Sequence, residues 1–408
     1  MSAPLKTAAT AAVSAASSFV PRAVFEVSPS ITRSYFLGHH AGALTSMRKI
    51  LSNIKLVLEC RDSRVPLSST NPLLERELAG RDRIIVYTKS DLCAPKSATR
   101  WRDKQQQLLE RYHKRRRRGD QLYTYEDEEA TPGDNSGMDG TPASKQSKKD
   151  ARKAKDEFPS VVFTDDQSPR SIQHLLDALK RRAVAADSLT GLRALVVGMP
   201  NVGKSTLLNA LRRVGLSLPK AARTGAQPGV TRKLGTPVRV IAEDSDRGIE
   251  QGVYVVDTPG VFVPYVGDVA SMLKLCLVGC VKDGLVPVEI VADYLLFHLN
   301  LRDPHIYADW CAPTNDVLEF LDAVARRTGK LGKGGVPIRE QAADWVVQQW
   351  RKGNLGRFGL DDVSDETLEE RMRKEMAGDE EHVSLSQARK LEKKERSAKA
   401  ALKRQGLA

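Results

Sequence analysis

The sequence contains no apolar run long enough to cross a lipid bilayer as a helix. Such a helix needs roughly 20 consecutive apolar residues, whereas the longest apolar runs, such as residues 195–197 and 253–256, have the length of a strand. We therefore predict no transmembrane segment, which leaves a soluble protein or one bound to a membrane surface. The 408 residues, of which 41% are hydrophobic, are sufficient for two packed domains and additional tails.

Cysteines and acids are also few. The five cysteines form neither a C-x-x-C pair nor a metal-spaced cluster with histidines, which excludes a zinc-finger or disulfide scaffold and predicts free thiols in a reducing compartment. The 51 acidic residues are outnumbered by 64 Lys and Arg, giving a net charge of +13. This balance favours a polyanionic partner, RNA or an anionic membrane surface, although a basic soluble protein without such a partner has the same composition.

Three stretches have a composition that does not suit a packed domain. The first 33 residues are rich in Ala and Ser with a single acid, Glu26, which is typical of an organellar transit peptide, the alternative being a disordered tail. Residues from about 114 to 157 contain charge runs and almost nothing apolar, so we expect a disordered insertion. Residues 377–408 form a basic tail that suits sequence-independent phosphate contacts, or a solvated helix.

Strand and helix patterns alternate through residues 34–265. Short apolar, β-branched runs predict buried strands at residues 54–59, 84–87, 161–163, 194–197, 237–242 and 253–256. Their alternation with helical stretches predicts an α/β domain with a mostly parallel sheet flanked by helices. From residue 266 to 376 the pattern is helical, which predicts a smaller all-α C-terminal domain.

A phosphate-binding loop follows the predicted strand at residues 194–197. Residues 198–205 read GMPNVGKS, which fits G-x-x-x-x-G-K-[ST] between a strand and a helix, the context that the motif requires. Backbone N–H groups of such a loop surround phosphates at a helix N-terminus. We expect Lys204 to reach the β- and γ-phosphates and Ser205 to ligate Mg²⁺. The other candidate contacts are Asn201, Val202, Gly203 and Thr206.

Two later segments complete a predicted Mg²⁺ and γ-phosphate site. Asp257 ends the predicted strand at residues 253–256 and opens the sequence D-T-P-G. Its carboxylate is expected to hold Mg²⁺ and the Gly260 amide to face the γ-phosphate. Between the two motifs, Thr231 in a Pro-Gly segment is the candidate that closes on Mg²⁺ and the γ-phosphate, with Thr224 as its competitor.

The predicted base is guanine. Directly after the predicted strand at residues 84–87, the [NT]-K-x-D pattern is matched by Thr88, Lys89, Ser90 and Asp91. The Asp91 carboxylate can accept hydrogen bonds from both N1–H and N2–H₂ of guanine, a donor pair that adenine lacks, and Lys89 is expected to pack along the base plane. Thr164, after the strand at residues 161–163, lies where a base-supporting loop is expected.

The order of these motifs is circularly permuted relative to ordinary GTPases, in which the phosphate loop comes first and the guanine motif last. With this order, the sequence resembles the circularly permuted GTPases of ribosome assembly, which include mitochondrial and bacterial large-subunit factors. The resemblance covers about residues 34–360 and rests on these motifs together with YFLGH at 35–39, RDSRVP at 61–66 and GNLG at 353–356. It implies a circularly permuted P-loop GTPase domain, whose sheet still forms because the loops meet in space.

The resemblance also implies slow GTP hydrolysis that the ribosomal particle stimulates, coupled to maturation of the mitochondrial large ribosomal subunit and its rRNA. It implies a catalytic role for His39, with His40 as competitor, and Val261 stands where other GTPases carry a water-orienting glutamine. Asn201 resembles the phosphate-loop asparagine of K⁺-activated GTPases. With the N-terminal composition, this predicts a monomer in the mitochondrial matrix and leaves open peripheral binding to the inner membrane.

Three alternatives stand beside this interpretation. A P-loop kinase or ATPase would make the match at residues 88–91 accidental. An RNA-binding assembly factor would use GTP only as a structural ligand. A cytosolic or nucleolar GTPase would have an N-terminal tail without an import function.

Overall fold

The computed structural model describes residues 19–27, 31, 38–95, 97–129, 161–186, 188, 190–225, 231, 234–263, 266, 268–376, 387, 390, 393, 394 and 397, without the side chains of residues 38–41 and 117–129. The chain forms two units. The larger comprises Ser28–Val286 and Arg357–Ala408, and the smaller comprises Met1–Val27 and Pro287–Gly356. The boundary therefore lies about 20 residues beyond the one expected at residues 265 and 266.

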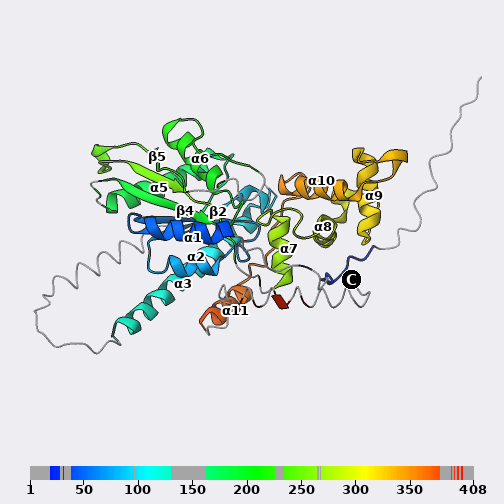
Figure 1. The fold of residues 1–408 in the computed structure, drawn as a ribbon, viewed down its shortest axis with the longest axis horizontal. Helices are drawn as coiled ribbons and strands as arrows, with labels where there is room; N and C mark the ends of the chain where they lie inside the picture. The colour runs from blue at the N-terminus through cyan, green and yellow to red at the C-terminus, as the bar shows by residue number, and fades with distance from the viewer. Residues whose placement is uncertain are drawn as a thin grey trace, which may run out of the picture. The chain divides into compact units, whose positions relative to one another are not determined.

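The larger unit contains a six-stranded sheet in the order β3-β2-β1-β4-β6-β5 (Figure 1). Neighbouring strands are parallel except for β5, which is antiparallel to β6. All six predicted strands are present. They are β1 Leu56–Asp62, β2 Arg83–Thr88, β3 Val161–Phe163, β4 Leu192–Gly198, β5 Val238–Ile241 and β6 Val253–Asp257. The carboxyl ends of the five parallel strands therefore share one edge of the sheet.

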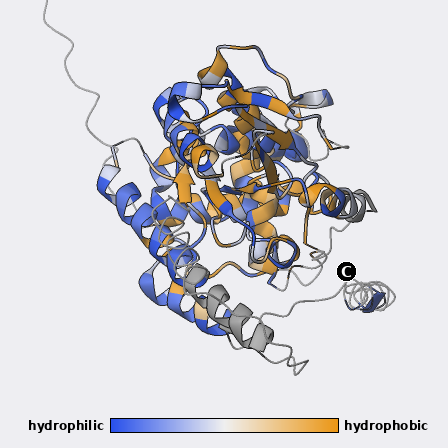
Figure 2. Cartoon of the chain, turned by 90° about the vertical axis from the view of Figure 1, so that its left-hand side faces the viewer, coloured by the Kyte–Doolittle hydropathy of each residue, from blue (hydrophilic) through white to orange (hydrophobic). Residues whose placement is uncertain are grey.

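Helices cover both faces of this sheet, with α1 and α2 on one face and α5 and α6 on the other (Figure 1). A cluster of buried apolar side chains joins α1 and α2 to β1, β4 and β6, and the strands carry most of the hydrophobic colour in Figure 2. The helices of this unit are α1 Gly38–Leu51, α2 Pro72–Glu77, α3 Thr99–Glu129, α5 Pro169–Ala186, α6 Lys204–Leu216, α7 Val269–Leu277 and α11 Asp365–Met376, with 3₁₀ turns η1 Ser90–Leu92 and η2 Ser245–Arg247.

Helix α3 overlaps the stretch that was expected to be disordered. The expected disordered insertion at about residues 114–157 begins inside this helix, which continues to Glu129; residues 130–160 lie outside the described residues. Extending an existing helix costs far less than starting one, and Arg, Gln, Leu and Glu all favour helix. The helix is anchored by Tyr112, whose hydroxyl donates to Glu375 of α11 at 2.8 Å. Helix α11 thus packs in the larger unit and not in the C-terminal domain expected at residues 266–376.

The smaller unit is helical, as expected, and consists of α8 Val288–Arg302, α9 Val317–Thr328 and α10 Arg339–Arg351, with 3₁₀ turns η3 Pro304–Tyr307 and η4 Lys333–Gly335. Part of the stretch with transit-peptide composition packs on it. Arg22 forms an ion pair with Asp293 at 2.5 Å, and the Phe25 ring lies edge-on to Tyr294. No helix in the described part of the chain is apolar and long enough to pass through a membrane.

Candidate nucleotide site

The predicted motifs meet at the carboxyl edge of the sheet. In open α/β sheets, ligands bind in the crevice outside this edge, where helices on the two faces diverge. Each of the five parallel strands ends here in a residue or loop of interest. These are Asp62, Thr88 and Asp257 at the ends of β1, β2 and β6, Thr164 after β3, and the phosphate loop after β4.

The phosphate loop between β4 and α6 has the backbone of an anion cradle. Gly198 has φ +147°, and a Cβ there would lie 2.4 Å from the Cys60 carbonyl oxygen, so only glycine fits. Asn201 and Gly203 also have positive φ, of 56° and 95°. Gly203 caps α6 without a side-chain hydrogen bond, and the first N–H groups of a helix have no intrahelical partner. This geometry suits a phosphate.

Lys204 lies at the start of α6 and is only 6% exposed. Its Nζ donates to the Met199 carbonyl oxygen at 2.6 Å. Burial lowers the pKa of the ammonium group, and the nearby Asp257 carboxylate acts in the opposite direction. The cation therefore lies inside the loop that is predicted to hold the phosphates.

The three predicted Mg²⁺ ligands come together from three separate segments. Ser205 Oγ donates to Asp257 Oδ2 at 2.5 Å and lies 3.2 Å from Thr231 Oγ1. Thr224, the competitor of Thr231, is exposed. Hydroxyl and carboxylate oxygens are the ligand types that Mg²⁺ prefers.

The Asp257 carboxylate shows that these residues fit a cation. Its Oδ1 is buried and has no hydrogen-bond partner among the described residues. Burial raises the pKa of this carboxyl, while the hydrogen bond from Ser205 and the charge of Lys204 act in the opposite direction. A buried carboxylate oxygen without a partner is costly unless a cation or water satisfies it. Elsewhere in the described residues, no cluster of three His, Cys, Asp or Glu side chains could hold a metal.

The D-T-P-G loop packs directly on the phosphate loop. A Cβ at Gly260 would lie 2.5 Å from Pro200 Cα and 2.6 Å from Pro200 N, so the two backbones touch. The Val261 N–H donates to the Gly198 carbonyl at 3.1 Å. The Val261 side chain is 3% exposed and belongs to the apolar cluster beneath α1. It therefore cannot orient a water molecule as glutamine does.

The guanine motif is bonded to the phosphate loop. Lys89, with φ 55°, donates from Nζ to the Asn201 carbonyl at 2.8 Å, and Thr88 Oγ1 donates to the Val202 carbonyl at 2.5 Å. These two contacts hold the predicted base-reading and phosphate-binding segments side by side. One bound nucleotide can therefore reach both.

Asp91, the predicted guanine reader, lies on η1 and is partly buried. Burial raises the pKa of its carboxyl, and Asp165 adds to the effect. Ser90 N–H donates to the Thr164 carbonyl at 3.1 Å, so the Thr164 loop contacts the motif from β3, and its role in supporting the base stays a prediction. Arg357 Nη1 lies 4.0 Å from Asp91 Oδ2.

Two contributors to this site were not identified from the sequence. Asp62 is fully buried and accepts from Lys89 Nζ and Arg64 Nη2, each at 2.8 Å. Burial opposes ionisation of Asp62, yet the charges of Arg64 and Lys89 outweigh it and hold the pKa below its ordinary value. The R-D-S-R run after an apolar strand was the available signal for Asp62. Arg357 has none, because it lies 266 residues from Asp91 in the chain.

The roles predicted for His39 and Asn201 stay predictions, as do those of the other nucleotide contacts. His39 lies in the first turn of α1, but its side chain is outside the described residues, so its catalytic role is untested. Asn201 Nδ2 donates to the Gly279 carbonyl at 2.9 Å. That bond leaves the K⁺ role of Asn201 untested.

Comparison with known proteins identifies the family. The 50S ribosome-binding GTPase family matches residues 193–297. Mitochondrial GTPase 1 of Schizosaccharomyces japonicus is 35% identical over 345 residues, which cover 83% of this chain and 93% of that protein. This chain belongs to the mitochondrial GTPase 1 family. Mitochondrial ribosome-associated GTPase 1 of Xenopus tropicalis is 29% identical, over 84% of this chain and 99% of that protein. The GNP-bound YlqF structure from T. maritima is 22% identical, covers 79% of this chain and 99% of that chain, and has a TM-score of 0.45.

The family confirms the prediction of a guanine-nucleotide-binding GTPase and removes the kinase and ATPase alternative. The sheet confirms the permuted order, because the guanine motif lies on β2 and the phosphate loop on β4, later in the chain and two strands away in the sheet. The expected fold, a permuted α/β GTPase domain with a helical C-terminal part, is therefore correct.

Proposed function

We propose that this GTPase acts in assembly of the mitochondrial large ribosomal subunit and so supports mitochondrial translation. The observation that carries the proposal is membership of a family with relatives named as mitochondrial and ribosome-associated, together with the match to the 50S ribosome-binding GTPases. The net charge of +13 supports contact with rRNA. The proposed location is the matrix, as a monomer, with peripheral binding to the inner membrane as an additional possibility.

In this proposal the two ends of GTP are held by different strands. Asp91 accepts from guanine N1–H and N2–H₂, and the Lys89 stem lies along the base. Lys204 exchanges the Met199 carbonyl, 2.6 Å away, for phosphate oxygens. A Mg²⁺ ion held by Ser205, Thr231 and Asp257 would neutralise charge on the β- and γ-phosphates.

Slow intrinsic turnover is part of the proposal. The Val261 side chain is buried, so the GTPase domain lacks the usual group that orients the attacking water. We propose that the ribosomal particle completes the site and that His39 acts with it. The same proposal assigns K⁺ to the Asn201 side chain, which a comparison of turnover in K⁺ and Na⁺ tests.

Co-sedimentation with mitochondrial large subunits tests the function. We expect the wild type to bind in the GTP-analogue state and to dissociate in the GDP state, with GTP turnover stimulated by the particle. Lys204→Ala is the control, since it should remove the nucleotide dependence. Equal binding in both states without stimulation would favour an RNA-binding factor that uses GTP only structurally. Fusing the first 40 residues to a reporter tests import separately.

A further inference from the structure

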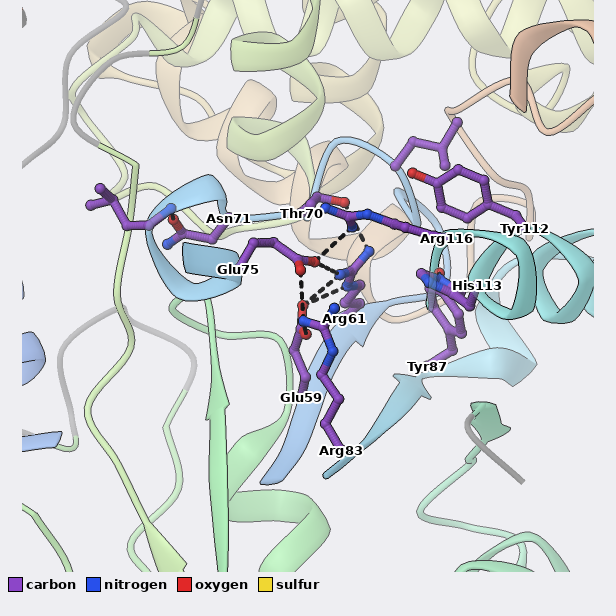
Figure 3. Close-up of polar contacts among 12 residues, drawn as sticks. Glu59, Arg61, Thr70, Asn71, Glu75, Arg83, Tyr87, Tyr112, His113 and Arg116 are labelled. Carbon is purple, nitrogen blue, oxygen red and sulfur yellow. Dashed lines mark hydrogen bonds and ion pairs between the residues drawn. The ribbon is translucent and has the colours of Figure 1, made fainter. Parts of the chain in front are cut away.

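A buried asparagine outside the recognised motifs contacts the D-T-P-G loop. Asn71 precedes α2 and is 1% exposed. Its carboxamide makes two hydrogen bonds. Oδ1 accepts from the Leu73 N–H at 3.0 Å, which caps α2, and Nδ2 donates to the Val261 carbonyl oxygen at 2.7 Å. Figure 3 shows Asn71 at one end of a group of polar residues.

The backbone of Val261 is thus held on both sides. Its N–H donates to the Gly198 carbonyl of the phosphate loop, and its C=O accepts from Asn71. Val261 directly follows Gly260, whose amide is proposed to face the transferring phosphoryl group. Asn71 therefore fixes the backbone next to the reacting phosphate from an element that carries no nucleotide contact of its own.

Helix α2 is a rigid platform for this contact. Glu75 of α2 forms ion pairs with Arg61 of β1 at 2.5 Å, Arg83 of β2 at 2.6 Å and Arg116 of α3 at 2.9 Å (Figure 3). Arg61 also pairs with Glu59 at 2.6 Å and is 1% exposed.

Glu75 keeps its charge in this buried cluster. Burial opposes its ionisation, but Arg83, Arg61 and Arg116 together hold the pKa of Glu75 below its ordinary value. A carboxylate bonded to three guanidinium groups from three elements leaves α2 little freedom to move. These contacts hold the helix that Asn71 caps, and with it the Asn71 carboxamide.

We propose that Asn71 is a positioning residue for GTP hydrolysis, acting through the Val261 carbonyl on the Gly260 amide. The inference rests on the proposed role of the Gly260 loop. Val261 stands where other GTPases carry the side chain that orients the attacking water. The backbone amides of the D-T-P-G loop are therefore the groups left to hold the γ-phosphate there. Asn71 stabilises the loop in the geometry that transfers the phosphoryl group.

The test variant is Asn71→Ser. Serine is a good helix N-cap, so α2 keeps its cap, but its hydroxyl is too short to replace the Nδ2 donor to Val261. The matched control is Asn300→Ser in the smaller unit. Asn300 is 3% exposed and its Nδ2 donates to the Thr314 carbonyl at 2.8 Å, so the variant loses the same kind of buried bond in the smaller unit, which holds none of the predicted nucleotide contacts.

We expect kcat of Asn71→Ser to fall about tenfold, because misplacement of reacting groups by ~1 Å costs up to about 10²-fold. KM for GTP and the affinity for GDP should stay within about twofold of wild type, since Asn71 contacts neither the base-reading nor the phosphate-binding segment. Asn300→Ser should lower Tm without changing kcat. If Asn71→Ser does not fold, Asn71→Thr, which also places an N-cap hydroxyl at α2, removes the same donor without adding a charge.

Two results would overturn the inference. One is an unchanged kcat in a folded Asn71 variant, and the other is a fall in kcat matched by an equal loss of GDP affinity, which indicates general damage to the site. A wild type that shows no hydrolysis in the same single-turnover assay, with or without large subunits, counts against the proposed function instead.

Discussion

Replacing Gly260 by alanine tests whether the contact between the D-T-P-G loop and the phosphate loop is needed for hydrolysis. The added Cβ would lie 2.5 Å from Pro200 Cα, whereas ordinary contacts begin at 3.4 Å, so restoring an ordinary contact separates the two backbones by about 0.9 Å. A displacement of ~1 Å in a reacting geometry costs about 10²-fold in rate, which corresponds to about 2.7 kcal/mol at about 1.36 kcal/mol per tenfold. Backbone strain adds nothing, because the φ of Gly260 is outside the left-handed region.

The assay is phosphate release under single-turnover conditions, with GDP affinity measured in parallel. Hydrolysis by Gly260→Ala should slow about 10²-fold, while GDP affinity falls less than tenfold, because GDP lacks the phosphate that Gly260 is proposed to face. The control is Gly359→Ala. This loop glycine also has no left-handed φ, and its added Cβ would meet only the Arg64 carbonyl at 3.6 Å. A Gly260→Ala rate within threefold of wild type would refute the reasoning.

Three further outcomes follow from single contacts. Asp91→Asn replaces the acceptor with a donor, so GTP affinity should fall about 10²-fold and xanthosine triphosphate should compete better than GTP in a displacement titration. Asp62→Asn should lower the free energy of unfolding at pH 7 by about 3 kcal/mol, because it breaks a buried ion pair. Since the pKa of Asp62 in the folded protein is below its ordinary 3.8, this stabilisation is complete above about pH 4 and disappears as the pH falls towards the folded value. The difference in unfolding free energy between wild type and variant, measured in urea, should therefore shrink from pH 7 to pH 3, and an unchanged difference would contradict the prediction. A double-mutant cycle on Arg22→Met and Asp293→Asn should give a coupling of about 1 kcal/mol, as for a partly exposed pair, and no coupling would mean that the N-terminal segment is not held there.

The parts of the site that the sequence predicted are those encoded locally. An apolar strand followed by GMPNVGKS and a helix predicts a phosphate-binding loop, because the loop, its glycines and the helix N-terminus are contiguous in the sequence. The same holds for D-T-P-G after β6 and T-K-S-D after β2. Their meeting at one sheet edge also follows from the sequence, since parallel strands end together.

The parts that it did not predict depend on distant pairs. Asn71 and Val261 are 190 residues apart, and Arg357 and Asp91 are 266 apart, so no local pattern marks either contact. Residues 114–129 were predicted to be disordered but are helical, for a different reason. A charged, apolar-poor stretch predicts disorder only when nothing supports it, and here the helix is already anchored by Tyr112 and its neighbours.

The N-terminal segment shows how composition can conceal a structural role. Few acids and many small residues are typical of a transit peptide, but two of its residues are also anchors. Arg22 pairs with Asp293, and Phe25 packs against aromatic rings of α8. A segment can therefore have the composition typical of a transit peptide and still contain single residues that pack on a folded unit.

The permuted order of the motifs places the D-T-P-G loop shortly before the smaller unit in the chain. The loop at residues 257–260 is followed by α7, and the smaller unit begins at Pro287, so only one helix separates the two along the chain. The chain returns from that unit at Gly356 and reaches Asp361, which is buried. Asp361 accepts from Lys274 of α7 at 3.0 Å and from Ser68 Oγ at 2.6 Å. The segments that enter and leave the smaller unit are thus tied to each other and to the loop that precedes Asn71. Within the larger unit, Asp361 therefore joins the segment that follows the smaller unit in the chain to α7, the first helix after the D-T-P-G loop, and to the loop that precedes Asn71.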